Sequence, residues 1–127
     1  MEVPILRQGA YLIASIQSAL EDEDLVRLRD ALTAQVGKAR ARGVIVDVTA
    51  LDVMDSFATR TLSELASIIR LRGAEMVIVG IQPEVAVALA RLGLKLEGVT
   101  TVLDLEEGIA YLDWKARASG KENNIRG

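Results

Sequence analysis

Short apolar runs and longer amphipathic stretches alternate along this chain. The short runs have the four-to-six-residue length and the β-branched content of strands. They lie at residues 3–6, 11–16, 44–48, 76–79 and 100–103. The third run follows Gly43 and is almost free of polar residues, which is typical of a strand covered on both faces.

Apolar residues three and four positions apart predict four helices between and after these strands. The predicted buried faces are Leu25, Leu28, Leu32 and Val36; Phe57, Leu62, Leu65, Ile68 and Ile69; Val85, Leu89 and Leu92; and Leu105, Ile109, Leu112 and Ala116. Asp22 or Asp24 is the predicted cap of the first helix, and Pro83 fits the first turn of the third.

The resulting order is β-β-α-β-α-β-α-β-α, with a hairpin turn near residues 8–10. Strands that alternate with helices imply crossover connections and a mainly parallel sheet, to which the opening hairpin adds one antiparallel strand. We therefore predict an α/β fold with a mixed, mainly parallel sheet and about four helices. Residues 1–118 form the single predicted domain, and the polar segment 119–127 is a predicted flexible tail.

Composition narrows the possible chemistry of this 127-residue chain. It has no cysteine and no histidine, so disulfides, Cys/His zinc sites, cysteine nucleophiles and imidazole bases are excluded. Lys and Arg number 15 against 18 Asp and Glu, giving a net charge of −3, and no basic stripe with interleaved aromatics occurs. Nucleic-acid binding is therefore not expected. No apolar run is long enough for a membrane span and the first residues do not resemble a signal peptide, so we expect a cytoplasmic protein without membrane contact.

Three acids, Asp47, Asp52 and Asp55, gather near the end of the third predicted strand. Such a group is a candidate Mg²⁺ site or a receiver-type phosphoacceptor. A receiver also needs an acidic pair after its first strand and a lysine near its last, and both are missing here. No nucleotide-binding glycine motif is present, and Gly80-Ile81-Gln82-Pro83 is interpreted as a plain turn between strand and helix. The three acids are interpreted as solvated loop residues, one of which helps to cap a helix.

Ser56 opens the second predicted helix and has two interpretations. From the residues alone, a simple N-cap is favoured. The same position suits a regulated phosphate, because the positive end of a helix dipole accepts an anion while Asp52 and Asp55 would repel a dianion beside them. Phosphate here is expected to leave the fold intact and to change the surface.

Several segments of the sequence resemble a known family. The segments 47–49, 54–57 and 73–86, together with Leu103-Asp104-Leu105-Glu106-Glu107-Gly108, resemble the STAS domain, and specifically stressosome scaffolds of the RsbS type. The resemblance covers roughly residues 3 to 115. Single-domain anti-sigma factor antagonists usually carry a glycine soon after the serine, where this chain has Phe57-Ala58. Sensory co-scaffolds carry an extra N-terminal domain, which the early first strand argues against.

The resemblance implies a non-enzymatic scaffold with no catalytic residue, no cofactor and no metal. Its implied partners are a serine/threonine switch kinase, a sensory STAS co-scaffold, a phosphatase that resets the serine, and further copies of itself in a large complex. The kinase phosphorylates the residue that matches Ser56, with Thr59 less favoured. The implied partner-binding residues are Asp55, Ser56, Phe57, Thr59, Gly80, Ile81, Gln82 and Glu84. Two alternatives stay open: a free-standing antagonist that binds an anti-sigma kinase, and a small-molecule or nucleotide-binding domain.

Overall fold

The strands and helices follow the predicted order. The computed structural model describes the backbone of residues 2–126 and the side chains of residues 2–118. Its elements are β1 (Ile5–Gln8), β2 (Tyr11–Ser15), α1 (Asp22–Ala39), β3 (Gly43–Asp47), α2 (Ser56–Leu71), β4 (Glu75–Val79), α3 (Pro83–Arg91), β5 (Thr100–Val102) and α4 (Leu105–Arg126). The first strand thus begins two residues later than the sequence predicts.

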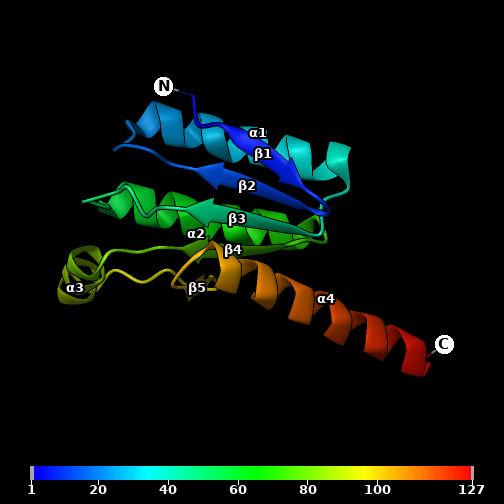
Figure 1. Ribbon diagram of the computed structural model, residues 1–127. Coiled ribbons are helices and arrows are strands. Elements are labelled where there is room, and N and C mark those ends of the chain that lie inside the picture. Colours follow the sequence, from blue (N-terminus) through cyan, green and yellow to red (C-terminus); the bar gives the residue numbers. More distant parts are fainter. Residues whose placement is uncertain (1, 127) are drawn as a thin grey trace.

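The five strands form one sheet in the order β1-β2-β3-β4-β5. β1 pairs with β2 antiparallel, and all later neighbours are parallel. The α/β fold and the mixed, mainly parallel sheet are therefore confirmed. Because β2, β3 and β4 run in the same direction, their carboxyl ends share one edge, where α2 and α3 begin (Figure 1).

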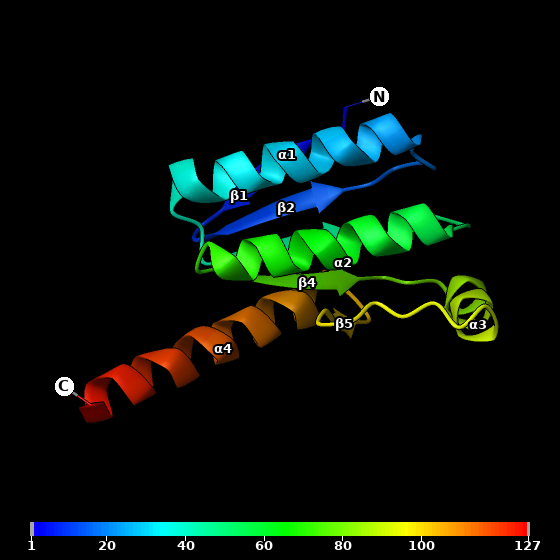
Figure 2. The same ribbon diagram turned by 180° about the vertical axis from the view of Figure 1, so that it is seen from behind.

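Helices cover the two faces of the sheet unequally. α1 and α2 lie side by side on one face (Figure 2), and their apolar stripes meet the sheet in the larger core cluster. Leu32 of α1 and Leu65 of α2 are 0% and 1% exposed. Burial of each such leucine contributes about 1.5–3 kcal/mol, so this layer supplies much of the stability.

α4 crosses the opposite face and continues past the amino ends of the parallel strands (Figure 1). Gly108 permits its close approach, since a Cβ there would lie 2.9 Å from Val79 Cγ1. Leu112 is buried against Gly43, and the Tyr11 hydroxyl of β2 donates a hydrogen bond to Asp113 of α4. Burial, followed by this hydrogen bond, raises the pKa of Tyr11 to about 12. The neutral hydroxyl therefore ties α4 to the sheet.

Some details differ from the sequence predictions. The N-cap of α1 is Glu21 and neither of the predicted caps: Asp22 is the first residue of the helix, and the Asp24 carboxylate accepts a hydrogen bond from the Glu21 N–H at 3.3 Å. Leu92 is 69% exposed because α3 ends at Arg91, and Leu105 at the start of α4 is also exposed. The helix α4 continues through 119–126; the flexibility of the segment 119–127 stays a prediction.

Candidate functional site

The predicted site residues lie on two connections at the carboxyl edge of the sheet and in the first turns of the helices that follow them. The first connection, residues 48–55, joins β3 to α2, and the second, residues 80–82, joins β4 to α3. β3 and β4 are hydrogen-bonded neighbours, so the two connections leave the sheet side by side. Ligand sites in parallel α/β folds usually occur at this edge, which makes it the place to look for function.

The start of α2 corrects one sequence interpretation. The N-cap is Asp55 and not Ser56: the Asp55 carboxylate accepts the Ala58 N–H at 2.8 Å. Asp and Ser are equally good caps, so two adjacent candidates could not be separated by residue type. Ser56 is therefore the first residue of the helix, and its hydroxyl is released from the capping role. The interpretation that one of the three acids caps a helix is confirmed.

The side chains of the first turn divide between solvent and core. Ser56 is exposed, and its hydroxyl bonds to none of the described residues. Phe57 is half-buried. Thr59 is 1% exposed, and its hydroxyl donates to the Asp55 carbonyl at 2.8 Å. Ser56 is thus the hydroxyl of this turn that an enzyme reaches without opening the helix.

A contact between Thr49 and Gly80 joins the two connections. Gly80 has φ +82°, and a Cβ on it would lie 1.9 Å from Thr49 Oγ1. Asp47 holds Thr49 in place by accepting its N–H at 2.9 Å and its hydroxyl at 2.6 Å. Gln82 then donates from Nε2 to the Thr49 carbonyl at 2.7 Å. Thr49 is absent from the predicted site residues, although its spacing from Asp47 is that of an Asx turn.

The remaining predicted residues flank this junction. Ile81 is half-buried against the main core, and Glu84 is exposed in the first turn of α3. Within the described residues, Asp47, Asp52 and Asp55 do not come together as an acidic group that could hold a metal ion. Asp47 instead accepts the N–H and the hydroxyl of Thr49, and Asp55 accepts the Ala58 N–H of α2.

The cap assignment yields a stability prediction. Asp55→Ala is expected to lower the free energy of unfolding by about 1 kcal/mol, because the Ala58 N–H loses its partner. Ser56→Ala is expected to change it by less than about 0.5 kcal/mol, because the exposed hydroxyl bonds to none of the described residues. Urea denaturation of both variants measures the difference. An equal or larger loss in Ser56→Ala would show that Ser56 is the cap.

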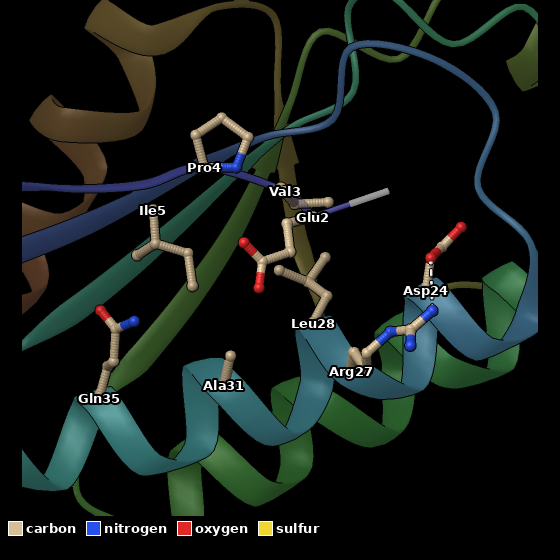
Figure 3. A pocket seen from close by; sticks show the side chains of 9 residues that line it. All are labelled: Glu2, Val3, Pro4, Ile5, Asp24, Arg27, Leu28, Ala31 and Gln35. Atoms are coloured by element: carbon tan, nitrogen blue, oxygen red, sulfur yellow. Dashed lines mark hydrogen bonds and ion pairs between the residues drawn. The ribbon is translucent and has the colours of Figure 1, made fainter.

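A separate hollow of about 290 Å³ lies on the far flank of the sheet, between β1 and α1. Figure 3 shows Pro4 and Ile5 on one side and Ala31 and Gln35 on the other. Arg27, at its rim, donates to the Asp24 carboxylate at 2.9 Å. None of the predicted site residues lines this hollow, which leaves the β3–β4 edge as the candidate site.

Comparison with known proteins agrees with this geometry. The family model of the STAS domain matches residues 3–108. The chain belongs to the STAS domain family. In this STAS domain the connection that leads to Ser56 and the turn after β4 follow neighbouring strands and meet where Thr49 contacts Gly80 and Gln82. None of the helices in the described residues has the length and apolar character that crossing a membrane requires.

Among solved structures, a serine-to-glutamate variant of RsbS from Moorella thermoacetica is 34% identical, with a TM-score of 0.78; the match covers 91% of this chain and 97% of that one. A chain from a structure described as the molecular architecture of the stressosome is 33% identical, with a TM-score of 0.72. The match covers 90% of this chain and 99% of that one. The RsbT co-antagonist protein RsbRA of Bacillus subtilis is 29% identical over 97 residues, 76% of this chain and 35% of the relative. The expected resemblance to RsbS and to stressosome proteins is therefore confirmed, and it supports a STAS signalling scaffold.

Proposed function

We propose that this STAS domain is a non-enzymatic stressosome scaffold that holds a serine/threonine switch kinase and releases it when Ser56 is phosphorylated. The observation that carries the proposal is the exposed Ser56 hydroxyl, free of hydrogen bonds to the described residues, at the start of α2 in a chain 34% identical to RsbS. The kinase supplies ATP, Mg²⁺ and the transfer chemistry. The scaffold supplies a hydroxyl and a surface on which the kinase docks.

The local geometry suits a phosphate on Ser56. Asp55 already caps the helix through Ala58, so modification of the next residue removes no structural bond. The N–H groups of Ser56 and Phe57 have no acceptor within the helix, because the first turn of any helix leaves such donors unpaired. These donors and the helix dipole favour an added anion. The fold is thus expected to survive phosphorylation.

The proposed docking surface combines the exposed start of α2 with the turn after β4. Asp55 and the first residues of α2, Ser56 and Phe57, contribute on one side; Gly80, Ile81 and Gln82 of the turn and Glu84 of α3 contribute on the other. The predicted partner-binding residue Thr59 is buried and is therefore not part of this surface. The hydrogen bond from Gln82 to the Thr49 carbonyl holds the two connections in one arrangement. A surface fixed before binding loses less conformational freedom when a partner docks, which favours tight binding.

The names of the relatives support self-association and a co-scaffold partner. RsbRA is named as a co-antagonist of RsbT, and the stressosome is described as a signal integration and transduction hub. We therefore assign this chain, in the cytoplasm, to a large complex formed with further copies of itself and with a sensory STAS co-scaffold. The proposed cycle also includes a phosphatase that removes the phosphate from Ser56.

Phosphate mapping tests the proposal. Incubation with the switch kinase and ATP is expected to place phosphate on Ser56, as mass spectrometry of the digested protein would show. Ser56→Ala should abolish incorporation, whereas Ser67→Ala, which removes an exposed serine of the same helix, should leave it unchanged. Unchanged incorporation in Ser56→Ala, or phosphate mainly on Thr59, would contradict the assignment.

A further inference from the structure

Arg60 lies on α2 four residues after Ser56 and is exposed. Among the described residues it has no hydrogen-bond or ion-pair partner. The acid one turn further along, Glu64, is engaged elsewhere, because it accepts Arg29 of α1 at 3.1 Å. Arg60 is thus a cation that the helix leaves unpaired, beside the proposed phosphorylation site.

The position of Arg60 relative to Ser56 suits an internal pair. Residues four apart share one face of a helix, and the order with the anion nearer the helix start is the more stabilising one. Helical side chains also lean toward the amino end, so Arg60 leans toward Ser56. Its guanidinium matches the geometry of a phosphate with two parallel hydrogen bonds.

A second cation, Lys95, lines the same hollow as Arg60. Arg60 and Lys95 both line an open hollow of about 470 Å³ between α2 and the connection after α3, together with Ser63 and Glu97. Lys95, like Arg60, has no hydrogen-bond or ion-pair partner among the described residues. The hollow lined by Arg60 therefore also contains a second cation, Lys95, and one acid, Glu97, and Ser56 lies one helical turn before Arg60 on α2.

We propose that Arg60 binds the phosphate on Ser56 within the same chain, with Lys95 as the second, weaker contact. The inference rests on the proposed function and adds the residue that stabilises the phosphorylated form of Ser56. Asp52 and Asp55 lie four residues and one residue before Ser56, and their negative charges oppose a dianion there, which Arg60 compensates. After phosphorylation, the docking surface presents an ion pair between the Ser56 phosphate and Arg60 of the same chain in place of the neutral Ser56 hydroxyl.

The test places phosphoserine at position 56 by genetic encoding, so that no kinase is needed. The phosphorus NMR signal is followed against pH at low salt in the wild-type sequence and in Arg60→Gln. A bound guanidinium favours the dianion, so Arg60→Gln is expected to move the titration midpoint up by about 0.5 pH unit. Lys95→Gln should move it up by less. Lys38→Gln, which removes one positive charge from the last turn of α1 at the other end of the sheet (Figure 2), should leave it unchanged.

Equal midpoints in the wild-type sequence and in Arg60→Gln, with circular dichroism showing both proteins folded, would overturn the inference. An upward shift of the same size in Lys38→Gln would overturn it as well, because the effect would then be one of net charge. Neither outcome bears on whether a kinase modifies Ser56. Conversely, failure of the kinase to modify Ser56 would contradict the proposed function and leave the Arg60 contact measurable.

Discussion

Gly80→Ala is expected to lower the free energy of unfolding by about 3 kcal/mol, a large share of the stability of a small domain. Two costs add at this position. Gly80 has φ +82°, which disfavours any residue with a Cβ, and the new methyl carbon would lie 1.9 Å from Thr49 Oγ1 and 3.2 Å from Thr49 Cα. Because Asp47 fixes Thr49 through two hydrogen bonds, the clash cannot be relieved by a simple side-chain rotation. Urea denaturation of the two proteins measures the loss.

Gly73→Ala is the matched control. Gly73 also has a positive φ, +88°, but a Cβ there would meet nothing within 4 Å. The free energy of unfolding of Gly73→Ala should fall by only about 1 kcal/mol, the cost of placing a residue with a Cβ at a positive φ. The difference between the two variants then isolates the contact between Thr49 and Gly80. Equal losses in both variants would show that this contact does not join the two connections.

Phosphorylation of Ser56 is expected to weaken binding of the switch kinase about thirty-fold, which corresponds to about 2 kcal/mol. The phosphate adds about −1.5 to −2 charges to a surface that carries Asp52 and Asp55 and that, in the proposal, meets the kinase with a neutral hydroxyl. Ser56→Asp brings one charge and fewer oxygens, so it should weaken binding less than the phosphate does. Isothermal titration calorimetry of the three forms measures these affinities.

The alternation of apolar runs and amphipathic stretches was enough to predict the element order and the mixed sheet. The spacing of apolar residues within a single segment is enough to indicate a strand or a helix, without information from the rest of the chain. The residues at which helices and strands end are harder to predict from the sequence. Leu92 continues the spacing of Val85 and Leu89, yet α3 stops at Arg91 and leaves Leu92 exposed. A periodic pattern shows which face a residue would occupy, but not where the helix ends.

In the candidate site, too, features that depend on neighbouring residues could be predicted, and contacts between residues distant in sequence could not. Ser56 stands out in the sequence because it lies beside acids where a strand run gives way to a helical pattern. The cap was assigned one residue too late, since Asp55 and Ser56 are both good caps and only the bond to Ala58 decides between them. The contact between Thr49 and Gly80 joins two connections that are distant in sequence, so no local pattern could reveal it.

In the proposed switch, unmodified Ser56 permits the kinase to bind, and phosphorylated Ser56 weakens binding enough to release it. The most direct measurement is a calorimetric titration of the switch kinase into unmodified protein and into protein phosphorylated at Ser56, with circular dichroism confirming that both are folded. The phosphorylated form is expected to have a dissociation constant about thirty-fold higher. A dissociation constant that is unchanged or lower after phosphorylation would contradict release, even if Ser56 is the modified residue.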